Sequence, residues 1–173
     1  LGAVPGARAS SLRWVPADTR VLVQVDAQNL ESQDRAREAL GLDAILGRLA
    51  TGWLPASQVQ EQIVAYVVEG TASHPVAFTF GRASLARAFE TLRGDKLETA
   101  GGQAMHASPK TRGWAMALVE PGCIAEGPRQ TLRAVLQHAA ADGRNVDDLP
   151  ATSVARRLAG LPATKTAAVG LVY

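Results

Sequence analysis

Residues 16–25 read Pro16-Ala17-Asp18-Thr19-Arg20-Val21-Leu22-Val23-Gln24-Val25, a proline-led turn that enters an apolar strand. The chain repeats this pattern near its end, where residues 162–172 read Pro162-Ala163-Thr164-Lys165-Thr166-Ala167-Ala168-Val169-Gly170-Leu171-Val172. An apolar strand left alone at a sheet edge would expose unpaired backbone groups and invite aggregation. We therefore predict that the strand at 167–172 pairs in the same sheet as the strand at 21–25, or else completes a neighbouring module.

The length of the chain, 173 residues, predicts one domain that is large enough to bury a core of its own. Hydrophobic residues make up 47% of it and charged residues 20%, which are values typical of globular proteins. Residues 1–11 are small and rich in Gly, Ala and Ser, so we expect a flexible N-terminal lead before a single domain at 12–173. Residues 162–173 are alternatively the start of a second, truncated copy of that domain.

Periodicity and turn residues predict an alternation of strands and helices that ends in a meander. The expected strands are 21–25, 63–68, 75–80, 97–99, 103–107, 114–119, 123–125 and 167–172, and the expected helices are 28–40, a short one after Asp43, 82–93, 128–141 and one starting at Pro150. Because strands run together more than they alternate with helices, the predicted class is α+β. We expect a largely antiparallel twisted sheet with the helices packed on one face, whose first part follows the β-α-β-β-α-β order of ferredoxin-like folds.

Glycine and proline fix the expected turns. The cluster at 69–73 should close an antiparallel hairpin between the strands at 63–68 and 75–80, and it would leave His74 in a turn. Gly101-Gly102 suits a tight hairpin, and Gly94 suits a left-handed stop for the preceding helix.

Strand alternation and helical spacing together predict one buried core. Its expected members are Phe78, Phe80, Leu85, Phe89, Val23 and Val25. Cys123 lies in a short apolar strand without a cationic neighbour in sequence, so we expect a buried and chemically inert thiol.

Composition excludes several function classes. The net charge is only +2 and its charges do not cluster, so no nucleic-acid partner is expected. No apolar stretch approaches the roughly 18 residues that span a bilayer, so no transmembrane segment is expected.

A single cysteine excludes an internal disulfide, and the three histidines, His74, His106 and His138, lack metal-ligand spacing. Asp147-Asp148 is better explained as a helix cap than as a cation site. We therefore expect no catalytic, cofactor-binding or metal-binding residues and no cofactor.

Tryptophans beside prolines are the candidate recognition residues. Trp14 and Trp53 each lie in or next to a loop, where a tryptophan either anchors the loop on the core or marks an interface. Core anchoring is the more common of the two roles, and the interface remains the alternative. Tyr173, in the terminal apolar run, is the third candidate interface residue.

Several segments resemble a group of exported bacterial α+β domains that have no assigned activity. The segments are Val15-Pro16-Ala17-Asp18-Thr19, Phe80-Gly81-Arg82 before Leu85-Ala86-Arg87-Ala88-Phe89, Cys123-Ile124-Ala125-Glu126-Gly127-Pro128, and Leu161-Pro162-Ala163. The resemblance implies a periplasmic or cell-envelope location and carries over no site residue.

Three functions are consistent with these observations. The first is a non-catalytic interaction or scaffold domain, a subunit of a larger cell-envelope assembly that binds a protein partner or forms a homo-oligomer. The second is a small-ligand binding domain with a pocket between sheet and helices. The third is a hydrolase in which His106 or His138 works with a carboxylate that the fold brings near.

Overall fold

The computed structural model describes residues 12–17, 19, 21–26, 44, 47–55, 57–69, 71–141, 143–148 and 168–171. The predicted N-terminal lead, the predicted helix at 28–40 and the predicted helix from Pro150 lie outside these residues. The hypothesis of a second copy from residue 162 stays a prediction, because most of that segment also lies outside them.

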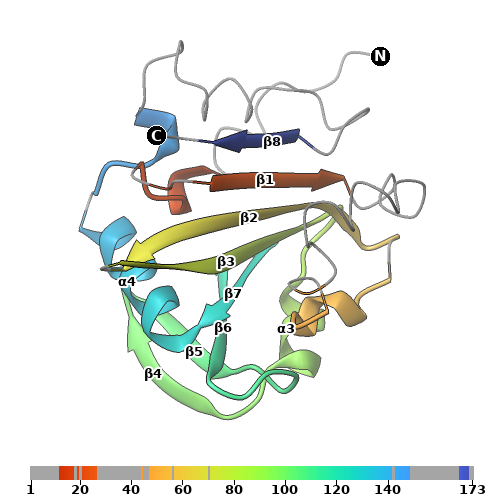
Figure 1. Cartoon of the computed structure of the whole chain (residues 1–173). Coiled ribbons are helices and arrows are strands. Elements are labelled where there is room, and N and C mark those ends of the chain that lie inside the picture. The colour runs from red at the N-terminus through yellow and green to blue at the C-terminus, as the bar shows by residue number, and fades with distance from the viewer. Residues whose placement is uncertain are drawn as a thin grey trace.

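Eight strands form the described sheet, and every neighbouring pair runs antiparallel. They are β1 (Val21–Asp26), β2 (Val59–Glu69), β3 (Ala72–Gly81), β4 (Lys96–Ala100), β5 (Gln103–Ala107), β6 (Trp114–Glu120), β7 (Cys123–Pro128) and β8 (Ala168–Leu171). Their order across the sheet is β4-β5-β6-β7-β3-β2-β1-β8, and the sheet curves so that β4 to β7 wrap below β2 and β3 (Figure 1). The β-α-β-β-α-β prediction was made for the order of elements along the chain, and the order of strands across the sheet is a separate property.

Helices pack against this sheet, which confirms the α+β class. The described helices are α3 (Ala86–Leu92) and α4 (Arg129–Ala140), with short 3-10 turns η1 (Leu12–Trp14), η3 (Ala50–Trp53) and η4 (Val146–Asp148). Pro128 precedes the first residue of α4, as its fixed backbone angle favours. Among the described helices, none is long and apolar enough to cross a membrane.

The two apolar runs that resemble one another are neighbours in the sheet. β8 pairs antiparallel with β1, in a register that joins Val21 to Leu171 and Gln24 to Ala168. This pairing confirms the prediction that the terminal strand enters the same sheet as the first.

The β2–β3 hairpin is confirmed, but its strands are longer than predicted. Ile63 pairs with Phe78, and the ladder continues to Glu69 and Ala72. His74 therefore lies within β3 opposite Val67, and its predicted place in a turn is wrong. The strands extend because backbone pairing continues through polar residues, a continuation that an apolar pattern does not reveal.

Glycine behaves as predicted at one turn and differently at another. Gly101 and Gly102 have φ angles of 54° and 79°, which confirms the tight β4–β5 hairpin. Gly94 does not adopt the left-handed conformation expected of it. Its N–H donates to the Ala107 carbonyl at 3.0 Å, and an added Cβ would come within 2.8 Å of that oxygen. Gly94 thus permits a close approach of two backbones instead of stopping α3.

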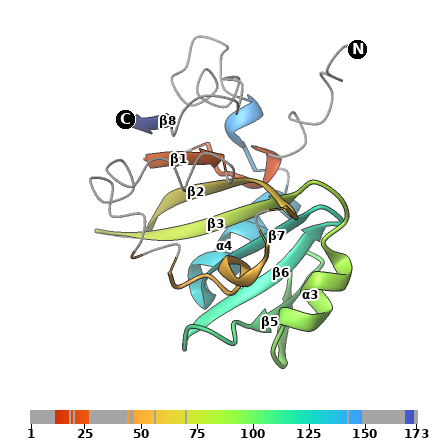
Figure 2. The same cartoon turned by 90° about the vertical axis from the view of Figure 1, so that its right-hand side faces the viewer.

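The helices α3 and α4 lie on opposite faces of the sheet, so the prediction that helices share one face is wrong. Ala115, Ala117 and Ala125 belong to the cluster that contains Leu132 and Leu136 of α4, whereas Met116 belongs to the cluster that contains Phe89 of α3. Since neighbouring strand residues face opposite ways, these clusters lie on opposite sides. Figure 2 shows α3 on one side of β6 and α4 on the other.

The predicted single core is accordingly divided in two. Phe78 is fully buried and Phe80 packs beside it on the α4 face, whereas Leu85 and Phe89 are buried on the α3 face. The side chains of Val23 and Val25 lie outside the described residues. The prediction failed because alternation assigns residues to a face of their own strand without saying which helix covers that face.

Candidate functional site

The candidate site is a groove of about 570 Å³ between the η3–β2 connection and α3. We call it the Trp53 groove. Its apolar lining residues include Trp53, Leu54, Pro55, Leu85, Ala88 and Leu92. The groove forms because η3 and α3 both cover the same face of the sheet, where Ala50, Leu85 and Phe89 share one buried cluster.

Trp53 is the most exposed large apolar residue of the described chain. Its exposed fraction is 57%, although the neighbouring Ala50 and Thr51 of the same 3-10 turn are buried. The Lys110 ammonium lies 5.5 Å from the centre of the indole ring, within the range of a cation–π contact. One end of η3 is therefore fixed in the core, while its other end presents an indole ring to solvent.

Positive charge borders this apolar surface. The described residues that line the groove include Arg82 and Arg87 and no carboxylate. Both arginines are exposed, and neither forms an ion pair with a described residue. By contrast, Arg93 pairs with Glu90 at 2.6 Å and Arg129 pairs with Glu98 at 2.7 Å. The groove thus combines an apolar floor with two guanidinium groups that have no carboxylate partner among the described residues.

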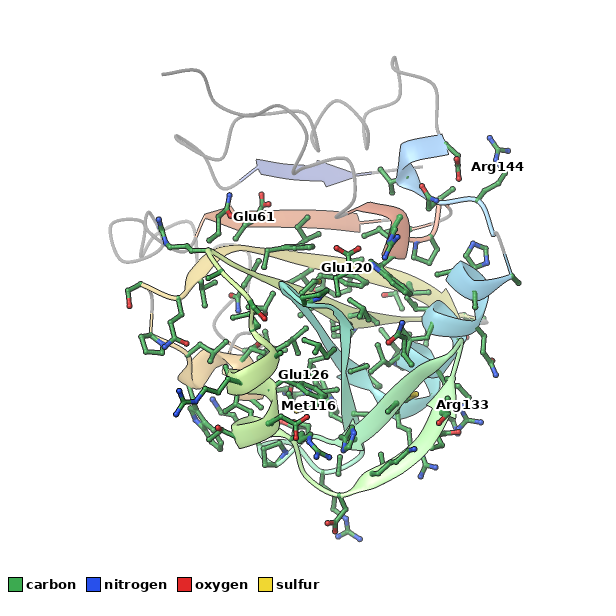
Figure 3. The ribbon with its side chains drawn as sticks, turned by 180° about the vertical axis from the view of Figure 1, so that it is seen from behind. Glu61, Met116, Glu120, Glu126, Arg133 and Arg144 are labelled. Atoms are coloured by element: carbon green, nitrogen blue, oxygen red, sulfur yellow. The ribbon has the colours of Figure 1, made fainter. Side chains whose placement is uncertain are left out.

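A buried carboxylate fastens η3 to the sheet. Glu126 lies at the centre of β7 with none of its surface exposed, beside Met116 of β6 (Figure 3). Its oxygens accept hydrogen bonds from the Ala50 N–H at 2.9 Å, the Thr51 N–H at 3.3 Å and the Ser108 hydroxyl at 2.6 Å. The first N–H groups of a helical turn have no partner within the turn, so a carboxylate is a favourable acceptor there.

A second polar chain attaches the same turn to the sheet. The Gln62 amide donates to Thr79 Oγ1 at 3.2 Å, and the Thr79 hydroxyl donates to Thr51 Oγ1 at 3.0 Å. All three residues are buried, so these hydrogen bonds form away from competing water. η3 is therefore held by strands β3 and β7 together.

Burial raises the pKa of the Glu126 carboxyl above its ordinary value of 4.5, although the donors on Ala50, Ser108 and Thr51 and the Lys110 charge oppose this. The folded state holds the Glu126 proton more tightly than the unfolded state does. The free energy of unfolding therefore falls as the pH rises above the ordinary pKa of the carboxyl. We expect the free energy of unfolding of the wild type, relative to Glu126→Gln, to fall as the pH rises above the ordinary carboxyl value of 4.5. Urea unfolding of both proteins across this rise in pH measures the difference, and a difference independent of pH would contradict the expectation.

The other predicted interface residues lie in different surroundings. Trp14 is only 7% exposed, and its Nε1–H donates to Glu120 Oε1 at 2.9 Å. Arg13 stacks on the ring at 5.0 Å and also pairs with Glu120 at 2.9 Å. Trp14 thus takes the core-anchoring role, at the edge of a polar hollow that Arg13, Asn145 and Asp148 also line. Tyr173 lies outside the described residues.

The residues weighed for catalysis do not come together in the described part of the chain. His106 contacts Arg93 Nη1 at 3.0 Å and the Gly94 carbonyl at 3.1 Å, and His138 contacts the Arg144 carbonyl at 2.9 Å. Neither histidine hydrogen-bonds to a described carboxylate, and the described His, Cys, Asp and Glu residues include no group of three placed to hold a metal ion. Asp148 accepts a hydrogen bond from the Asn145 N–H at 2.8 Å, and the helix that it was expected to cap lies outside the described residues.

Cys123 is fully buried, as predicted. Burial and the Glu120 charge hold the pKa of its thiol well above the ordinary value, although the Arg13 charge opposes them. A thiol that stays protonated is a poor nucleophile, so the structure gives a physical reason for the predicted inertness.

Comparison with known proteins assigns no family. No protein-family model matches the chain, and no curated protein matches it. A solved structure described as "Structure of crystal form IV of TP0453" is similar, with 15% sequence identity and a TM-score of 0.45. The likeness covers 80% of this chain and 57% of that chain, so this chain spans just over half the length of its structural neighbour. A likeness of this size assigns no function to the chain.

Proposed function

We propose that this chain is a non-catalytic protein-interaction domain whose binding face is the Trp53 groove. The observation that carries the proposal is Trp53 itself, a tryptophan that is 57% exposed beside an apolar groove. Tryptophan, with tyrosine and arginine, is enriched among the few side chains that dominate binding energy in protein interfaces. The buried network holds Ala50 and Thr51 of the same turn, so the backbone of the turn would lose little conformational entropy when a partner binds.

The partner that fits this groove is a protein segment that combines apolar side chains with carboxylates. The apolar part matches the surface formed by Leu54, Ala88 and Leu92, and the carboxylates match Arg82 and Arg87. Exposed arginines of this kind mainly set the association rate and the choice of partner, whereas the desolvated tryptophan supplies affinity. Binding should therefore weaken with added salt without disappearing.

Replacement of Trp53 should abolish most of the binding. The probe is a short fluorescein-labelled peptide in which two leucines are flanked by glutamates, and fluorescence anisotropy measures its affinity. Trp53→Ala is expected to weaken binding at least about 30-fold, the effect of losing a residue worth 2 kcal/mol or more. A double change of Arg82→Glu and Arg87→Glu should also weaken binding and remove much of its salt dependence.

Two controls make this experiment specific. Leu97→Ala removes another exposed large apolar residue, which lies on β4 and outside the groove, and should leave affinity unchanged. A peptide with lysines in place of the glutamates should bind more weakly than the original. If only an anilinonaphthalene sulfonate dye binds at Trp53, and neither peptide does, a small apolar ligand is the occupant and the proposal is wrong.

The cell-envelope location implied by the sequence resemblance is part of the proposal. Fractionation of cells that express the full natural protein tests it. Recovery of the protein with the envelope or periplasmic fraction would support this location, and recovery with the cytoplasmic fraction would contradict it.

A further inference from the structure

We propose that Glu126 and Ser108 act together as a positioning device for the Trp53 groove, which we call the Glu126–Ser108 clamp. The inference rests on the proposed function, because it concerns the same groove. It assigns to two residues that do not line the groove the role of holding its tryptophan in the binding geometry.

The clamp joins the rigid interior of the sheet to the base of η3. Glu126 is on β7, which pairs with both β6 and β3 and is therefore an internal strand. Its carboxylate accepts hydrogen bonds from the N–H groups of Ala50 and Thr51, at the start of the 3-10 turn that ends at Trp53. These two N–H groups and Trp53 belong to the same four-residue turn, so fixing the start of the turn limits the backbone positions from which the indole ring can project.

Ser108 links the loop between β5 and β6 to the same carboxylate. Its hydroxyl donates to Glu126 Oε1 at 2.6 Å, and it begins the loop between β5 and β6. Two further residues of that loop contact η3 or the chain just before it. Thr111 Oγ1 donates to the Arg48 carbonyl at 2.8 Å, and Lys110 lies over the Trp53 ring. Strand β7 and this loop therefore both hold η3, and Glu126 accepts hydrogen bonds from the start of η3 and from Ser108 of the loop.

A carboxylate is a costly group to bury for stability alone. Apolar residues of similar volume often stabilise a core at least as well as buried charged groups do, whereas directional hydrogen bonds specify one arrangement of the backbone. The surrounding cluster of Ala50, Met116 and Ile124 is apolar, so a purely apolar contact would suffice to cover this face. The directional contacts of Glu126 account for a fixed orientation of η3, which the apolar cluster alone would leave less defined.

The test compares two mild variants with a control on the other face. Ser108→Ala removes one donor, and Glu126→Gln keeps the side-chain volume but replaces one acceptor oxygen with an amide group. Val135→Ala, on α4 across the sheet, lowers stability without touching η3. The readouts are affinity for the leucine–glutamate peptide, backbone amide exchange at Ala50 and Thr51, and the midpoint of thermal unfolding.

If the clamp positions Trp53, affinity for the peptide should depend on how firmly η3 is held and not on the overall stability of the protein. Ser108→Ala and Glu126→Gln should each weaken peptide binding at least about threefold and speed amide exchange at Ala50, because less of the binding geometry is preformed. Val135→Ala should lower the melting midpoint at least as much and leave affinity unchanged. Wild-type affinity in both clamp variants, with Trp53→Ala still defective, would overturn the clamp and leave the proposed function standing. Wild-type affinity in Trp53→Ala as well would overturn both.

Discussion

Glu126→Ala is expected to lower the free energy of unfolding by about 2–4 kcal/mol, because it leaves buried donors without an acceptor. The groups affected are the N–H groups of Ala50 and Thr51 and the hydroxyl of Ser108, all of which lie in buried residues. The variant no longer buries a carboxylate, and this gain offsets part of the loss in the free energy of unfolding but not all of it. Urea unfolding at neutral pH measures this change.

The control for this variant is a glutamate whose partner is at the surface. Glu90 is exposed and pairs with Arg93, the residue that follows α3, and such surface pairs contribute between about 0 and 1 kcal/mol. A loss in Glu126→Ala that does not exceed the loss in Glu90→Ala would show that the buried network adds little to stability.

Phe89→Ala should cost about 3–5 kcal/mol, the usual effect of removing a buried phenylalanine ring. Phe89 is only 4% exposed, and it packs with Leu85 and Met116 between α3 and the sheet. Its ring also packs perpendicular to the His106 ring, with ring centres 5.6 Å apart and an interplanar angle of 88°. Loss of this ring removes the main anchor of α3, which forms one wall of the Trp53 groove.

Thr91→Ala is the matched control on the same helix. Thr91 is exposed, so its replacement should change the free energy of unfolding by no more than about 0.5 kcal/mol. Chemical denaturation of both variants provides the comparison. A cost below about 1 kcal/mol for Phe89→Ala would show that α3 is not held by its apolar face.

Turn chemistry and alternation made much of the sheet predictable. The β4–β5 hairpin follows from Gly101-Gly102, because both residues adopt positive φ angles that few other residue types tolerate. The β2–β3 hairpin follows from two apolar runs on either side of a short polar cluster. The β1–β8 pairing was predictable from the repeated proline-led entry, a signal that does not depend on the intervening chain.

The division of the helices between two faces was not predicted, although β6 carries a sign of it. Residues 114–119 read Trp114-Ala115-Met116-Ala117-Leu118-Val119, an apolar run without alternation. Such a run is typical of a strand that is buried on both faces, which requires a helix on each side. Helical periodicity identified an apolar stripe on α4 but could not assign that stripe to a face of the sheet.

Of the residues in the candidate site, only Trp53, the most exposed one, was predicted from the sequence. Trp53 was a candidate because a tryptophan beside Pro55 either anchors a loop or marks an interface, and here it is exposed. The groove depends on the approach of η3 to α3, which no local pattern encodes. Glu126 was missed, although a single acidic residue at the centre of the apolar strand Cys123–Pro128 was a signal for a buried, partnered carboxylate.

The most direct test of the Trp53 groove is an NMR titration of the ¹⁵N-labelled protein with the leucine–glutamate peptide. Among the three tryptophans only Trp53 is exposed, so its indole N–H is the one that a peptide bound at the surface should shift, while those of Trp14 and Trp114 serve as internal references. We predict that the largest shifts occur at the Trp53 indole and at the backbone amides of Leu54, Arg87 and Thr91. Shifts concentrated instead at Arg13, Asn145 and Asp148, or no saturable shifts at all, would contradict the account.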